Sequence, residues 1–491
     1  MKSIKNNILK ISVIAFALTA TSCEKFLDVN DTPNNPLEVP AATLLPTGLA
    51  GTAFANSNEL NRFASTIMSV TAGAGGSPTS YDRYIIDGDD FGNQWNFELY
   101  GGALINYKKL IETAELNNSP AYAGIGKIMK AFTFAMATDI WGDVPYSEAL
   151  TGDIGMTRPR LDAQKDIYLG NSTAGIQSLF DLVKEGLADL DKDSPLKPGS
   201  DDIVYGGKIE NWKRAGNSLL LRLALQISSV EAAAAKTVIQ DVITKNMFIN
   251  ANAANLSVKF GSQVGSQAPI WTLTHNSLFQ NELIISTRFV DLLKGKKDPR
   301  LPLFVTNNDG AYVTIDNGYG GTLPAVGSRS IYNSYATGRD GEGPTRLLTY
   351  AQTSFILAEA VVRLGVTGDA QALYQQGIQA SMQEAGVAAA DITKYFAENA
   401  AEVALTGTNE QKIEKIVTQK YISLFSNGLE QWNDWRRTGY PVLTAHQNAG
   451  GIDGTRPVRA VYLFSEQQRN PNFPQGNTVP QSNVRVWWDA N

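Results

Sequence analysis

The spacing of apolar residues in the first half of the chain is the feature that most limits its fold. Between residues 176 and 190, apolar side chains recur at i, i+3, i+4, i+7, i+11 and i+14, which places them on one face of an α-helix. These residues are Ile176, Leu179, Phe180, Val183, Leu187 and Leu190. Residues 124–141 and 219–227 are apolar on nearly every face, as in helices that are buried all round. The pattern predicts a helical scaffold over about residues 41–245.

A second helical block is predicted over about residues 346–440. Within it, residues 357–364 and 370–382 have helical patterns, with a turn over Gly365 to Asp369. The pair has the size and the small/large alternation of a tetratricopeptide unit, although no strict period of about 34 residues repeats along the chain. An ordinary antiparallel helix pair fits the same residues. The predicted fold class is mostly α, a tetratricopeptide-like helix-pair scaffold.

Two regions have the composition of loops. Residues 306–345 contain eight glycines, with turn signals at Asn308-Asp309-Gly310 and Asp316-Asn317-Gly318. We therefore expect a loop-rich insertion with a few short β segments over about residues 246–345. Residues 441–491 contain scattered prolines and form a second loop-rich region, at the C-terminal end.

The N-terminus has the pattern of an exported, lipid-anchored protein. A basic start with Lys2, Lys5 and Lys10 precedes an apolar run over residues 11–20, and Cys23, the only cysteine of the chain, follows small residues. This resembles a bacterial lipoprotein signal, in which the cysteine is acylated. The apolar run is too short to remain as a membrane-spanning helix. We expect a signal peptide over 1–22, a lipid-anchored tether over 23–40 and a single domain over 41–491.

Composition excludes several classes of function. The net charge of −6 and a pI near 5.3 argue against nucleic-acid binding, which needs clustered basic residues. One cysteine and two histidines, His275 and His446, leave little material for a zinc site or for histidine-based catalysis. No HExxH, Walker A or GxSxG pattern is present. The sequence therefore predicts no catalytic residues, no cofactor and no metal centre.

One acidic segment partly matches a calcium-binding loop. Asp87, Asp89 and Asp90 are followed by Glu98 at the twelfth position, but Phe91 occupies a position where an oxygen ligand is required. An acidic surface loop is the alternative interpretation of this segment.

Further segments carry a family resemblance. In order along the chain they are Thr138 to Leu150, Arg158 to Tyr168, Trp212 with Asn217 to Arg222, Gln419 to Tyr421 with Glu430 to Pro441, and Arg485 to Asp489. Together with Phe26-Leu27-Asp28 after the lipoprotein cysteine, they resemble the SusD/RagB outer-membrane lipoproteins of Bacteroidetes. We expect the tryptophans of these segments to pack in the core, and Arg436 and Arg437 to pair with buried carboxylates.

The resemblance implies a fold and a role. It implies one large α-rich domain of tetratricopeptide-like helix pairs whose loops form a ligand surface. It also implies a surface-exposed nutrient-binding lipoprotein of the outer membrane that captures a glycan or a peptide. The partner implied is a TonB-dependent β-barrel transporter of the SusC/RagA kind, and no bond of the ligand is broken.

Aromatic residues in loops are the candidate ligand contacts, because a sugar ring presents an apolar face edged with hydroxyls. They gather in two places, after the glycine-rich residues 73–76 and in the glycine-rich insertion. The candidates are Tyr81, Tyr84, Trp271, Tyr312, Tyr319, Tyr332 and Tyr335. Of these, Trp271, Tyr81 and Tyr335 are the contacts we expect first. Packing beneath the loops is the alternative role for each of them.

Two other classes of function stay open at this point. An exported glycoside hydrolase would use a pair of carboxylates held in a cleft, and no such pair stands out in the sequence. A structural surface lipoprotein would have no small ligand at all.

Overall fold

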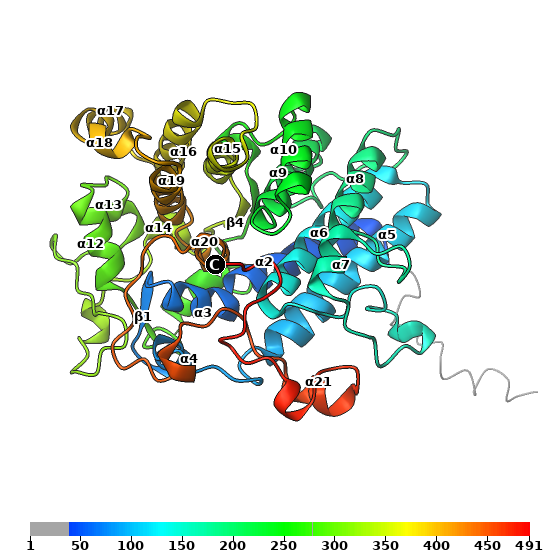
Figure 1. Ribbon diagram of the computed structural model, residues 1–491, viewed down its shortest axis with the longest axis horizontal. Helices are drawn as coiled ribbons and strands as arrows, with labels where there is room; N and C mark the ends of the chain where they lie inside the picture. The colour runs from blue at the N-terminus through cyan, green and yellow to red at the C-terminus, as the bar shows by residue number, and fades with distance from the viewer. Residues whose placement is uncertain (1–38, 277) are drawn as a thin grey trace, which may run out of the picture. The chain divides into compact units, whose positions relative to one another are not determined.

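The periodic apolar segments are helices in the computed structural model, which describes residues 39–276 and 278–491 (Figure 1). Cys23 and the segment predicted as signal peptide lie outside the described residues. Residues 41–491 form one unit, and helices make up most of its regular structure, with only short strands. The prediction of a mostly α fold is thus confirmed. In the described part of the chain, no helix is both long and apolar enough to cross a membrane.

The first helical block runs from Ala41 to Lys245. It comprises α2 (Ala41–Ser57), α3 (Glu59–Ile67), α4 (Gly76–Asp82), the π-helix η1 (Gln94–Leu104), α5 (Ile105–Leu116), α6 (Pro120–Trp141), α7 (Gln164–Leu169), α8 (Leu179–Leu190), α9 (Ile209–Gln226) and α10 (Ala232–Lys245). The apolar stripe of α8 is shorter than predicted, because Ile176 precedes the helix and forms an isolated bridge with Asn171. Its side chain is nevertheless buried.

Close backbone contact joins α6 to α8, which lie side by side in Figure 1. Gly124 of α6 and Gly186 of α8 face each other, and a Cβ added to either would lie within 2.8 Å of the other's carbonyl oxygen. Two glycines at the crossing let the helices approach more closely than side chains would allow.

The insertion over residues 246–345 contains the predicted short strands and more helix than predicted. β1 (Thr71–Gly73) pairs antiparallel with β3 (Leu283–Ile285), and β2 (Leu256–Val258) pairs antiparallel with β4 (Thr345–Leu348). Between these strands lie α11 (Pro269–His275), α12 (Thr287–Gly295), α13 (Leu301–Phe304) and α14 (Ser334–Thr337). Short helices with few turns carry too little periodicity for the sequence to reveal them.

The second helical block contains the predicted helix pair. α15 (Tyr350–Leu364) ends at Gly365, whose φ of +61° is the left-handed conformation that glycine adopts easily, and Asp369 caps α16 (Ala370–Ala385). α17 (Ala389–Glu398), α18 (Ala400–Val403), α19 (Asn409–Ser423) and α20 (Gly428–Thr438) follow, and α21 (Phe464–Arg469) is the last α-helix of the described residues. Phe355, Tyr374 and Ile378 are fully buried between α15 and α16.

Buried charges connect the two blocks. Asp139 of α6 accepts from Arg222 of α9 at 2.7 Å, and the same guanidinium reaches Glu430 of α20 at 2.7 Å. Trp488, near the C-terminal end, donates to the Asp139 carboxylate at 2.9 Å. The segments that carry the family resemblance therefore meet in the core.

The two arginines of α20 differ from each other. Arg437 pairs with Glu359 and Asp434, as predicted. Arg436 does not pair with a carboxylate: it donates to the carbonyl oxygens of Asp139 and Val458 and lies 3.7 Å from the ring of Trp432. The prediction for Arg436 is thus wrong, because its donors are taken by one carbonyl of α6, one carbonyl of the C-terminal region and the side chain of Asn433. Burial lowers the pKa of Arg436 to about 10, and the negative charges of Asp139 and Asp489 offset only part of this effect.

Candidate functional site

A tight turn between β1 and α4 begins the candidate site. Gly73, the first of the glycine-rich residues 73–76, is buried, and a Cβ there would lie 2.3 Å from the carbonyl oxygen of Pro78. The close approach folds α4 back onto β1. As a result, the backbone N–H of Gly73 donates to the carboxylate of Asp82, at the end of α4, at 3.2 Å.

Asp82 joins this turn to the glycine-rich insertion. Its side chain is only 2% exposed. Its carboxylate accepts from the backbone N–H of Gly318 at 2.6 Å and from the side-chain amide of Asn317 at 2.6 Å. Asn317 in turn donates to the carbonyl oxygen of Thr71 at 2.8 Å. The turn that carries Tyr319 is thus fixed against β1 and α4 by hydrogen bonds to buried groups.

A third segment, from the C-terminal region, closes around the same carboxylate. The Nδ1 atom of His446 lies 2.9 Å from the carbonyl oxygen of Asp82, and Nε2 lies 3.0 Å from the hydroxyl of Ser69. Its ring packs on Tyr84, with 4.6 Å between ring centroids. Burial lowers the pKa of His446, so the imidazole is neutral near pH 7. The histidine holds a loop in place and does not face solvent.

The three segments surround a cleft of about 320 Å³, which we call the Asp82 cleft. Asn448 donates to the carbonyl oxygen of Gly318 at 3.0 Å and forms one wall. Tyr319 is 41% exposed, and Arg83 is exposed beside it. The full lining is Gly73, Thr79, Asp82, Arg83, Gly318, Tyr319, Gly320 and Asn448.

The chemistry of this lining suits a polyhydroxylated ligand. An exposed tyrosine ring offers a flat apolar face, and a guanidinium and an amide offer planar hydrogen-bonding groups at its edge. Of the glycines in the lining, Gly320 is exposed, so its backbone is accessible to a ligand. Asp82 is the one acidic residue among those that line the cleft, so the lining offers no pair of carboxylates. The Asp82 carboxylate already accepts hydrogen bonds from two backbone N–H groups and a side-chain amide.

Four of the predicted ligand contacts are buried. Tyr81 and Tyr84 are 1% exposed, Tyr332 is 4% exposed and Tyr335 is 7% exposed. Tyr81 donates to Glu59 at 2.7 Å, and Tyr335 packs against Phe304 and beneath Arg346. A ring without an exposed face cannot stack on a solute, so in this structure these four tyrosines have the packing role that the sequence left as the alternative.

The other three predicted contacts remain accessible in different places. Tyr319 lines the Asp82 cleft. Trp271, on α11, is half-buried and stacks on His275 with 3.7 Å between ring centroids. Tyr312 is half-buried under the ammonium group of Lys294, 5.3 Å from the ring centroid. Only Tyr319 therefore shares the cleft with Arg83.

Sequence reasoning missed Thr79 and Asn448 as cleft residues. Neither has a signal of its own in the sequence: each is a small polar residue without a motif, and only the fold brings residues 79 and 448 to the same place. The position of Arg83 beside Tyr319 could not be inferred from the sequence either, because the two residues are far apart along the chain.

The acidic segment that partly matches a calcium-binding loop forms hydrogen bonds between its carboxylates and nearby groups of the chain. Asp87 accepts from the backbone N–H of Asp89 at 2.8 Å, and Asp90 accepts from that of Asp87 at 2.7 Å. Glu98 accepts from Asn58 at 2.7 Å. Within the described residues, no group of three or more histidine, cysteine or acidic side chains is placed to hold a metal ion.

Solved structures similar to this chain share its fold. A chitin-binding protein matches with a TM-score of 0.76 and 24% identity, covering 91% of this chain and 100% of its own. A SusD homolog from Bacteroides fragilis matches with a TM-score of 0.73 and 25% identity over 91% of this chain and 99% of its own. A chitin-binding SusD homolog from Flavobacterium johnsoniae has a TM-score of 0.72 and 23% identity, with coverage of 91% and 99%.

A family model identifies the chain more directly. No curated protein matches the sequence. However, the SusD-like model described as "Starch-binding associating with outer membrane" matches residues 33–462, which is most of the chain. This match extends from the segment before α2 to the region before α21, and it includes all three segments of the Asp82 cleft. The chain therefore belongs to the SusD/RagB family.

Proposed function

We propose that this protein binds an oligosaccharide in the Asp82 cleft at the cell surface and delivers it to a TonB-dependent transporter of the SusC/RagA kind. The observation that carries the proposal is the meeting of Tyr319, Arg83 and Asn448 in one cleft. Members of the family bind carbohydrate without catalysing a reaction, so the chain is a binding protein and not an enzyme.

Stacking on Tyr319 supplies the apolar part of the interaction. The ring is exposed, so a sugar can cover it, while the side chains of Arg83 and Asn448 are placed to hydrogen-bond the hydroxyls at the rim. Two of the similar structures are named as chitin-binding, which supports a glycan over the peptide that the sequence left open. The identity of the sugar is to be found by binding measurements.

Changing Tyr319 tests the cleft. Tyr319→Ala removes the stacking face, and we expect binding of starch or chitin oligosaccharides to weaken about five- to tenfold, the equivalent of about 1 kcal/mol. Tyr319→Phe keeps the ring and is the matched control, with nearly unchanged affinity expected. Isothermal titration calorimetry measures both variants.

The outcome also separates the competing functions. A well-folded Tyr319→Ala variant with full affinity would move the ligand site elsewhere. Release of new reducing ends from the oligosaccharides would favour a glycoside hydrolase. Binding of peptides alone would change the ligand class, and no binding to either kind of ligand would favour a structural lipoprotein.

Anchoring and partnership form a second part of the proposal. We expect Cys23 to be acylated and to hold the protein on the outer membrane, because several acyl chains together anchor a protein stably. Cys23→Ala should release the protein from membranes, and continued labelling of this variant by a fatty acid would contradict the assignment.

Detergent extracts of native membranes should yield a complex with a large β-barrel protein, whereas a free monomer alone would argue against the transporter.

A further inference from the structure

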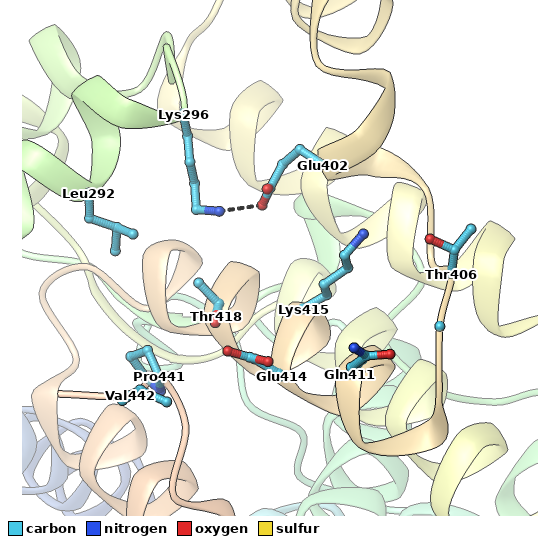
Figure 2. Close-up of a pocket in the computed structure, with 11 residues that line it drawn as sticks. Leu292, Lys296, Glu402, Thr406, Gln411, Glu414, Lys415, Thr418, Pro441 and Val442 are labelled. Carbon is cyan, nitrogen blue, oxygen red and sulfur yellow. Dashed lines mark hydrogen bonds and ion pairs between the residues drawn. The ribbon is translucent and has the colours of Figure 1, made fainter.

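A second, larger cavity lies between α12, the start of α19 and the segment after α20. Its volume is about 590 Å³, within the range of small-molecule sites. It shares no lining residue with the Asp82 cleft. Figure 2 shows its side chains around one open space, with Leu292, Pro441 and Val442 on one side and polar groups on the others.

The polar wall of this cavity is one face of α19. Gly407, with φ of +101°, turns the chain into the helix, and Thr408 and Gln411 form a capping box that fixes where α19 begins. Counting from Gln411, Glu414, Lys415 and Thr418 follow at i+3, i+4 and i+7, and all of them line the cavity. The cap thus sets which side chains face this space.

The charges in the cavity are balanced. Lys296, directly after α12, pairs with Glu402 at 2.6 Å, the dashed contact in Figure 2. Lys415 donates to the carbonyl oxygens of Ala401 and Ala404 at 2.8 and 2.9 Å. Within residues 39–276 and 278–491, neither Glu414 nor Thr418 has a side-chain hydrogen bond or ion pair, so both are available to a ligand.

We infer that this cavity binds a neutral, polyhydroxylated ligand of one or two sugar residues, independently of the Asp82 cleft. Two ammonium groups and two carboxylates line it, so a ligand with net charge of either sign meets a like charge. A sugar hydroxyl both donates and accepts, so it can donate to the carboxylate of Glu414 and form a hydrogen bond with the hydroxyl of Thr418, while Lys296, Glu402 and Lys415 keep the partners they already have. The apolar side chains of Leu292, Pro441 and Val442 cover the C–H face of the ring.

The test uses the full chain in detergent with Tyr319→Ala as background, so that the Asp82 cleft is weakened. Saturation-transfer NMR is recorded with glucose, maltose, N-acetylglucosamine and chitobiose as probes. We expect transfer to at least one probe to persist in this background and to fall severalfold on adding Thr418→Trp, which fills the cavity and leaves only the weakened Asp82 cleft. Thr244→Trp, on the exposed face of α10, is the matched control and should leave the transfer intact.

A second variant is needed because Thr418→Trp could reduce binding by disturbing the fold. Glu414→Gln combined with Thr418→Val removes a charge and a hydroxyl at nearly constant volume, and we expect affinity for the bound probe to fall at least about tenfold. No transfer in the Tyr319→Ala background, or transfer unaffected by both cavity variants, would overturn the inference. Stronger transfer to glucuronate or ethanolamine than to every neutral probe would overturn it as well. If the wild-type protein showed no oligosaccharide binding in the Asp82 cleft, that result would contradict the proposed function and would leave the inference about this second cavity unaffected.

Discussion

At the scale of single residues, Asp82 organises the ligand site without being exposed to it. Its carboxylate accepts from Gly73, Asn317 and Gly318, which belong to two segments far apart in the sequence. His446 adds a third segment through the carbonyl oxygen of the same residue. One buried carboxylate therefore sets the distance between Arg83 and Tyr319.

Replacing Asp82 tests this role. Asp82→Ala leaves buried N–H donors without acceptors, and each such donor costs about 1–3 kcal/mol, so we expect the free energy of unfolding to fall by at least about 3 kcal/mol. Urea denaturation measures the change. Asp87→Ala, in the exposed acidic loop nearby, is the control, for which we expect a change within about 0.5 kcal/mol. Equal stability of the two variants would mean that Asp82 does not hold the cleft together.

Only part of this site could be predicted from the sequence. Tyr319 was found because an aromatic residue in a glycine-rich turn is a recognisable pattern. Tyr81 and Tyr335 have the same local pattern and are buried, since exposure depends on which segments cover a loop. The sequence does not show that the region of His446 folds over Tyr84, because that contact joins residues more than 300 positions apart.

At the scale of helices, the contact between α6 and α8 depends on glycine at the crossing. Gly124→Leu places a side chain against the carbonyl oxygen of Gly186, which as backbone cannot move aside. We expect a loss of at least about 2 kcal/mol in the free energy of unfolding, since overpacking typically costs 1–3 kcal/mol. Ala188→Leu, on the exposed face of α8, is the control and should change stability little. Similar thermal unfolding of both variants would contradict the close packing.

The long helices could be predicted, whereas the short ones could not. α6, α9, α15 and α16 extend over enough turns for an apolar face to repeat, and Gly365 with Asp369 marks a helix end and start. α11 and α12 have too few turns, and they lie in a region whose glycines and turn signals favour loops. Their positions follow from the pairing of β1 with β3 and of β2 with β4, which the sequence does not reveal.

At the scale of the whole molecule, a buried ion pair joins the two helical blocks, and a buried hydrogen bond joins the C-terminal end to the first of them. Arg222 of the first block contacts Glu430 of the second, and Trp488 reaches Asp139. Within the second block, Glu359 of α15 pairs with Arg437 of α20 at 2.9 Å between Oε2 and Nη2. Such buried pairs make stability depend on the charge state of their carboxylates.

This dependence gives a prediction for acid unfolding. Burial alone would raise the pKa of Glu359, but Arg437 and Arg363 lower it to about 2, compared with 4.5 for the unfolded chain. Because the unfolded state binds the proton first, the stabilisation from this pair is fully present above pH 4.5 and is lost as the pH falls toward 2. Its size is roughly 3 kcal/mol. Urea titrations between pH 7 and 3 should therefore show a steeper loss of stability for the wild type than for Glu359→Gln, which has no carboxylate to titrate. Asp139, whose pKa burial raises, is present in both proteins and cancels in the difference. Parallel pH profiles for the two proteins would show that the Glu359–Arg437 pair does not contribute to acid stability.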